Sequence, residues 1–133
     1  MNVKSLEWEQ AVEVRKDLCE VVNTLQLKHI DLERIFCYRT MGSKSRAYAR
    51  IWCFPKIFQD ALDIKPAYVI EILSKYYDRL GKDDQKKVLI HELLHIPKNF
   101  SGALVPHKTR TRRISILTNQ LFKEYKTKMK NEK

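Results

Sequence analysis

Two histidines, His91 and His95, lie four residues apart in the stretch HELLH, and Glu92 directly follows the first. Four residues make slightly more than one turn of an α-helix, so both imidazoles fall on one helix face and can bind the same metal ion. HExxH on a helix is a zinc-binding pattern. Glu92 points about a third of a turn away from His91, which suits a base acting on metal-bound water rather than a ligand. The pattern therefore predicts a Zn²⁺ site for amide hydrolysis, with Glu92 as general acid/base.

A catalytic zinc ion usually has three protein ligands and one open position. His107 follows His95 by twelve residues, across a segment in which Pro97 ends the helix and Gly102 permits the chain to reverse. We therefore expect His107 to be the third ligand. The fourth histidine, His29, lies near the end of the first predicted helix, and we expect it to be unrelated. The alternative third ligands are Cys37, Cys53 and Glu124.

The helix that carries HELLH must hold these side chains inside the protein. Its first turns are polar, and Asp83 or Asp84 can cap it, whereas VLIHELLHI is apolar nearly all round. Such a helix enters the centre of the fold. Two imidazoles and a carboxylate are costly to bury without partners, which favours a metal site over a core helix that carries two histidines by coincidence.

Hydrophobic spacing and turn residues predict the remaining elements. In chain order they are a helix over 6–25, strands over 34–39 and 47–54, a short helix over 55–62, a third strand over 67–73, the HExxH helix up to Pro97 and a basic amphipathic helix from Ile114 to Met129. In the first helix, Trp8 and Val12 are expected to widen the apolar stripe. The predicted fold class is α+β, with a small, mostly antiparallel sheet of about three strands.

The length and composition of the chain indicate one domain over residues 1–133, with an ordinary apolar fraction of 44%. No stretch approaches the roughly 20 apolar residues that span a bilayer, so we expect no membrane partner. The first residues are charged where a signal peptide needs an apolar core. Three widely spaced cysteines without a CxxC pair favour reduced, mostly buried thiols. These features predict a cytoplasmic protein.

A net charge of +10 is large for this length and attracts polyanions, above all DNA or RNA. Basic residues occur in the loop GSKSRAYAR and in the segment HKTRTRR. A solvated basic surface without a partner explains the same pattern. The candidate nucleic-acid-binding residues are Lys44, Arg46, Arg110, Arg112 and Arg113.

The run VLIHELLHIPKNFSGALVPHK resembles a family of metallopeptidases found in archaea and phages, which are similar to SprT-like zincins. A softer likeness extends over roughly residues 34–110. The resemblance implies a zincin-like fold in which His91, His95 and His107 bind zinc and Glu92 is the catalytic acid/base. It also implies a peptide or protein substrate, held by an edge strand of the sheet that we place at 67–73.

Three functional hypotheses follow. The first is a zinc-dependent peptidase with a preference for proteins associated with nucleic acid. The second is a basic nucleic-acid-binding protein whose zinc site is structural or vestigial. The third is a metal-dependent hydrolase of another amide or an ester. Glu92 separates the first two, because a structural zinc ion has no need of a carboxylate beside it.

Overall fold

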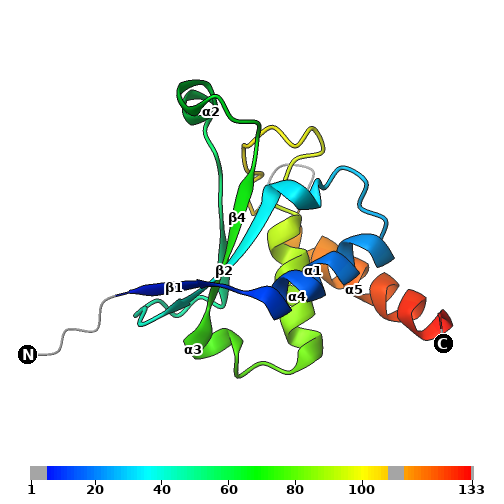
Figure 1. Cartoon of the computed structure of the whole chain (residues 1–133). Helices are drawn as coiled ribbons and strands as arrows, with labels where there is room; N and C mark the ends of the chain where they lie inside the picture. The colour runs from blue at the N-terminus through cyan, green and yellow to red at the C-terminus, as the bar shows by residue number, and fades with distance from the viewer. Residues whose placement is uncertain (1–5, 108–112, 133) are drawn as a thin grey trace, which may run out of the picture.

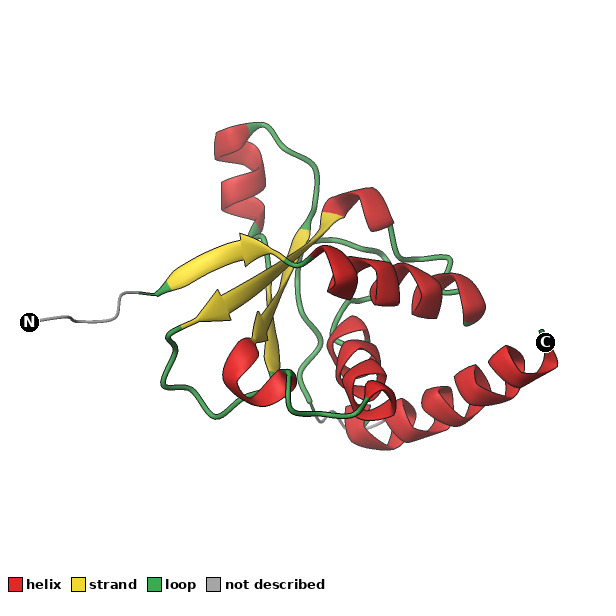
Figure 2. Cartoon of the chain, turned by 60° about the horizontal axis from the view of Figure 1, so that its bottom comes forward, coloured by secondary structure: helices red, strands yellow, loops and turns green. Residues whose placement is uncertain are grey.

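The fold is a four-stranded mixed sheet covered on one face by three helices, as seen in a computed structural model that describes residues 6–107 and 113–132 (Figure 1). Its elements in chain order are β1 (Glu7–Gln10), α1 (Val12–Thr24), a 3₁₀ helix (Leu32–Arg34), β2 (Ile35–Met41), β3 (Ala49–Trp52), α2 (Lys56–Leu62), β4 (Tyr68–Leu73), α3 (Ser74–Tyr77), α4 (Lys82–Leu93) and α5 (Ile114–Asn131). Helices α1, α4 and α5 lie together on one side, and α2 stands apart from them (Figure 2). The predicted α+β class is confirmed.

The order of the strands in the sheet is β1-β2-β4-β3. The outer pairs, β1 with β2 and β3 with β4, are antiparallel, whereas the central pair β2 and β4 is parallel. The expected sheet of about three strands was one strand short. Two of the three pairings are antiparallel, as predicted, but the parallel central pair makes the sheet mixed. The strand at 67–73 was also expected at an edge, but it is the central strand β4. Five of the six residues of β4 are buried, which suits a strand with neighbours on both sides.

The first predicted helix was too long at its N-terminal end. Residues 7–10 form β1 against β2, and the helix begins only at Val12. The backbone N–H of Ala11 donates to the carbonyl of Cys37 at 3.0 Å, which prolongs the contact with the sheet. Trp8 and Val12 are exposed by 60% and 72%, so neither belongs to the apolar stripe. Tertiary pairing overrides helical periodicity in this segment.

The core lies between the sheet and the helical layer. Ile35, Ile70 and Ile72 on the strands are completely buried, and their partners come from α1 and α4. Burying one such side chain contributes about 1.5–3 kcal/mol relative to exposure, so α4 is held firmly at the centre of the fold. The helix residues of this core that are also nearly inaccessible are Val14, Leu18, Val21, Leu89, Ile90 and Leu93.

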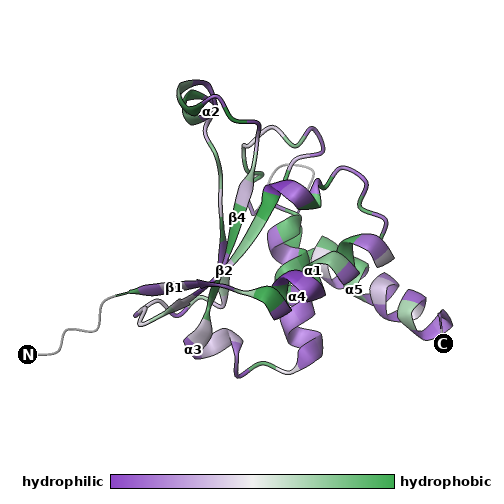
Figure 3. Cartoon of the chain, viewed as in Figure 1, coloured by the Kyte–Doolittle hydropathy of each residue, from purple (hydrophilic) through white to green (hydrophobic). Residues whose placement is uncertain are grey.

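Helix α4 has the expected gradient, hydrophilic at its beginning and hydrophobic towards its end (Figure 3). Gly81 occupies the N-cap position without any side-chain cap, so the expected capping by Asp83 or Asp84 was wrong. Both aspartates instead lie in the first turn, where they interact favourably with the helix dipole. The helix was predicted to run up to Pro97, but it ends at Leu93, so His95 lies in the turn that follows.

The three cysteines are free thiols, but only Cys37 is fully buried, while Cys53 is exposed. Part of the cysteine prediction is therefore wrong. Among the helices of the described residues, none is both long and apolar enough to cross a membrane.

Candidate metal centre

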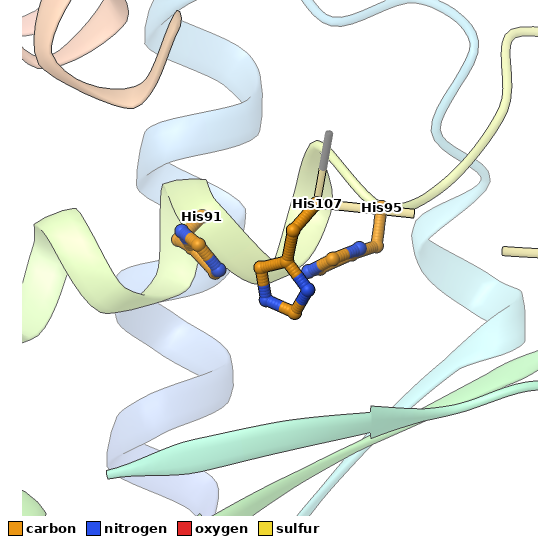
Figure 4. A group of neighbouring side chains, drawn as sticks. All are labelled: His91, His95 and His107. Carbon is orange, nitrogen blue, oxygen red and sulfur yellow. The ribbon is translucent and has the colours of Figure 1, made fainter. Parts of the chain in front are cut away.

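Three imidazoles converge beside the end of α4 (Figure 4). His91 belongs to the last turn of α4, His95 to the turn after it, and His107 to the end of a long loop. One ring nitrogen from each histidine lies within 4.8 Å of the other two. The ring centroids are 4.4–5.2 Å apart. The structure thus brings together the three residues that the sequence suggested.

The alternative third ligands are not part of this cluster in the described portion of the chain. Cys37 is buried within β2, and Cys53 is exposed just after β3. The carboxylate of Glu124 forms an ion pair with Lys128 at 3.1 Å on α5. The group that can hold a metal ion consists of the three histidines, and it does not include His29.

The donor set fits a zinc ion with an open coordination position. Two nitrogens bound to one zinc at ~2.0–2.1 Å lie no more than about 4.2 Å apart, so small side-chain rotations suffice to close this cluster around an ion. A ligating histidine must be neutral. Burial, reinforced by His95 and His107, lowers the pKa of His91 to about 4, which keeps its lone pair free at neutral pH.

His95 is oriented by a reciprocal contact with the loop that carries His107. Its Nδ1 lies 2.6 Å from the carbonyl oxygen of Val105, and a carbonyl can only accept, so Nδ1 carries the proton. The backbone N–H of Val105 donates to the carbonyl of His95 at 2.7 Å. With the proton on Nδ1, Nε2 carries the lone pair that can bind a metal, and such outer contacts fix the tautomer and ring orientation of ligating histidines.

Tyr68 of β4 anchors the same loop through its hydroxyl group. Its side chain is completely buried in β4, and its hydroxyl donates to the carbonyl of Ala103 at 2.8 Å. The same hydroxyl accepts from the backbone N–H of Gly102, also at 2.8 Å. This role was not predicted from the sequence, although a tyrosine in a buried strand needs a partner for its hydroxyl.

Gln59 of α2 provides a second anchor. Its side-chain amide donates to the carbonyls of Phe54 and Ser101 at 2.7 and 2.9 Å. The Phe54 N–H in turn donates to the carbonyl of Gly102 at 3.1 Å. Gly102 has a φ of +94°, and a Cβ atom there would lie 2.5 Å from the Phe54 oxygen, so glycine is required. The expected reversal at Gly102 is confirmed.

The far end of the loop is joined to α5, because the Ile114 N–H donates to the carbonyl of His107 at 3.1 Å. His107 itself is exposed, unlike the buried His95. The third imidazole is therefore presented from the surface side of the cluster, on a loop that is fixed at both ends.

Glu92 lies beside the three histidines and is 7% exposed. Burial raises its pKa to about 7. A cation bound nearby would act in the opposite direction, because it favours the charged carboxylate. Glu92, His91 and His107 line a cavity of about 400 Å³ between α4, the start of β3 and the first turns of α5. Glu92 is therefore next to the cluster but is not one of the three residues whose ligand atoms converge, and its role as acid/base stays a prediction.

The candidate nucleic-acid-binding residues are only partly described. Lys44, Arg46 and Arg113 are exposed. Arg110 and Arg112 lie outside the described residues. Binding of DNA or RNA through this basic surface stays a prediction.

No curated protein and no solved structure matches the chain significantly. Residues 6–126 match the family described as Putative phage metallopeptidase. The match includes both α4 and the loop that presents His107, so it covers every residue of the cluster. The chain therefore belongs to this family.

Proposed function

We propose that the protein is a zinc-dependent peptidase in which Glu92 is the general acid/base. The observation that carries this proposal is the convergence of His91, His95 and His107 next to the buried Glu92, which shares a cavity with His91 and His107. Membership of a metallopeptidase family supports the same reaction class. The cluster is consistent with a zincin-like site, and kinship with SprT-like zincins is part of the proposal.

The chemistry divides between the ion and the protein. When bound, zinc would polarise the scissile carbonyl and lower the pKa of a coordinated water to about 7. The carboxylate of Glu92 takes a proton from the attacking water, and its acid form gives a proton to the leaving amine. Glu92 is 7% exposed and lines the cavity together with His91 and His107, which supports this role.

The substrate would bind along β3 rather than along β4. β4 is paired on both sides, whereas β3 is an edge of the sheet and packs against α4. Ala49 at the start of β3 lines the cavity that holds Glu92. An extended peptide can add to such an edge through backbone hydrogen bonds. We therefore keep the hypothesis that an edge strand binds the peptide, but we assign this role to β3 instead of β4.

Metal content and turnover test the proposal together. We expect about one zinc ion per chain in untagged protein, and cleavage of unfolded protein substrates that chelators abolish. Glu92→Gln should retain the zinc and the fold but lose turnover by at least about 10²-fold, the usual contribution of a general acid/base. Undiminished turnover in zinc-loaded Glu92→Gln would show that the mechanism is wrong.

The second candidate is a basic nucleic-acid-binding protein with a structural or vestigial zinc site. The exposed Lys44 and Arg46 lie in the loop before β3, and neither has an ion-pair partner in the described residues. Binding of this kind must weaken steeply between low and moderate salt. A Lys44→Glu, Arg46→Glu variant should then lose affinity for DNA or RNA while its peptidase turnover stays unchanged. Any preference for substrates associated with nucleic acid would disappear with it.

The third hypothesis, a hydrolase of other amides or of esters, is distinguished from a peptidase by its substrates. Such an enzyme would use the same histidines and Glu92, but small acylated compounds would be turned over and extended peptides would not.

A further inference from the structure

Lys87 differs from the other lysines of α4 in its electrostatic partners. The ammonium groups of Lys82 and Lys86 form ion pairs with Asp17 and Glu20 on α1, at 3.7 and 3.0 Å. Within the described part of the chain, Lys87 has no carboxylate in ion-pair range. The helix thus carries one half-buried cation that the fold does not neutralise.

This cation lies at the cavity that is lined by His91 and His107, two of the three clustered histidines. Lys87 precedes His91 by four residues, so the two share one face of α4, and both line the cavity. The opposite wall comes from α5, where Ser115 and Asn119 supply a hydroxyl and an amide. The Lys87 ammonium lies 4.9 Å from the centroid of the Phe122 ring, which holds it across the gap between the two helices.

Among the described residues that line the cavity, Glu92 carries the only carboxylate, and the proposed reaction uses it. The Thr118 hydroxyl donates to the carbonyl of Ile114 within its own helix, at 2.7 Å. A bound metal would make the cavity still more positive. A negatively charged group of a ligand is therefore the complementary occupant.

We propose that the cavity wall formed by Lys87, Ser115 and Asn119 is a subsite for a carboxylate of the substrate. That carboxylate is either an aspartate or glutamate side chain near the scissile bond or the C-terminal carboxylate of a peptide. The proposal rests on the proposed peptidase function and adds a substrate class to it. The amide and hydroxyl can donate to the carboxylate, and the ammonium supplies the charge.

Peptide binding tests the subsite without relying on turnover. The protein is the zinc-loaded Glu92→Gln variant, titrated by calorimetry with short peptides blocked at both ends. Each peptide carries one glutamate, moved through successive positions, and its matched partner carries glutamine there. A further peptide is neutral and has a free C-terminal carboxylate, which separates the two sources of charge.

At the best position, we expect the glutamate peptide, or the peptide with a free C-terminus, to bind about tenfold more tightly than its neutral partner. Lys87→Met should remove this preference, Lys87→Arg should restore much of it, and Lys87→Glu should favour a lysine peptide. Lys28→Met, a control at an exposed lysine that does not line the cavity, should retain the preference.

Equal binding of charged and neutral peptides by the parent, or a preference that survives Lys87→Met, would overturn the subsite. Failure of the zinc-loaded variant to bind any of the peptides would overturn it as well. The peptidase function is judged separately, by zinc content and by turnover of the protein with Glu92 intact. A peptidase without a carboxylate preference is therefore distinguishable from a protein that is not a peptidase.

Discussion

The two halves of the histidine cluster are positioned in different ways. His91, Glu92 and His95 come from five consecutive positions on α4 and the turn after it, so local backbone geometry sets their spacing. His107 comes from a loop, and its position depends on contacts with Tyr68 of β4 and Gln59 of α2. One half of the site is local in the sequence, and the other half is assembled by the fold.

This difference has an energetic counterpart. The helical half is embedded in the core, because Leu89, Ile90 and Leu93 of α4 are almost inaccessible. The loop half is held mainly by hydrogen bonds, each of which contributes about 0.5–1.5 kcal/mol net. We expect substitutions of the loop anchors Tyr68 and Gln59 to reduce zinc affinity in part. Loss of His91 and His95 should abolish zinc binding.

The largest effect is therefore expected for His91→Ala combined with His95→Ala. This variant loses two of three donors and should bind no zinc, measured as metal per chain in untagged protein. His29→Ala, a control at the histidine outside the cluster, should keep the zinc content of the parent. Zinc retained by the double variant would mean that the cluster is not the metal site.

Gly102→Ala is expected to have the next largest effect. Its backbone has a φ of +94°, and the new Cβ would lie 2.5 Å from the Phe54 carbonyl oxygen and 2.2 Å from the Gln59 amide nitrogen. The amide can move, but the backbone oxygen cannot, so the loop must shift away from the cluster. Zinc affinity should fall by about 10–100-fold, as for other supports of a metal ligand.

Competition with a chromophoric chelator measures this affinity. Gly81→Ala is a matched control, because a Cβ there meets nothing within 4 Å. If both variants bind zinc like the parent, the position of His107 does not depend on these loop contacts, and the proposed difference between the two halves of the site is wrong.

Tyr68→Phe should weaken zinc binding less, by about tenfold, because it removes one anchor and leaves those of Gln59. Tyr77→Phe provides the matched control, since the Tyr77 hydroxyl is buried and has no hydrogen-bond partner in the described structure. Its removal should leave zinc affinity unchanged. Equal losses in the two variants would indicate a general effect of core tyrosines rather than loop positioning.

The same division explains which features the sequence could predict. The HExxH helix, the short helix at α2 and the role of Gly102 follow from local spacing and from proline and glycine chemistry. The histidine cluster could be predicted because the spacing of His91 and His95 already indicates a metal site, and His107 is the next histidine along the chain. Tyr68 and Gln59 were not predictable, since they lie 34 or more residues from the loop that they hold.

The sheet shows the same limit. β1 was taken as the start of α1, because its pairing with β2 depends on residues more than 25 positions away. The central place of β4 also depends on long-range pairing, here with Ile35 and its neighbours across a parallel register. Its nearly continuous apolar sequence, YVIEIL, was the available signal, and Glu71 within it was the exception.

The smallest effect on zinc is expected for Glu71→Gln, which tests whether damage to the sheet alone disturbs the loop. Burial raises the pKa of Glu71, but hydrogen bonds from Thr40, Trp52 and Arg50, with the charge of Arg50, outweigh it and hold the pKa below its ordinary value. The ionised group therefore stabilises the fold above the unfolded pKa, near 4.5, and this contribution is lost as the pH falls through the lower folded pKa.

Thermal unfolding of the metal-free protein between pH 7 and pH 3 measures this contribution. Glu71→Gln should lower stability at pH 7 by about 1 kcal/mol and should flatten its decline below pH 4.5, because the amide does not titrate. Zinc affinity at pH 7 should match that of the parent. A loss of affinity as large as that of Tyr68→Phe would show that the loop responds to any weakening of the sheet. The contrast between a local and an assembled half of the site would then not hold, because the anchors would have no special role.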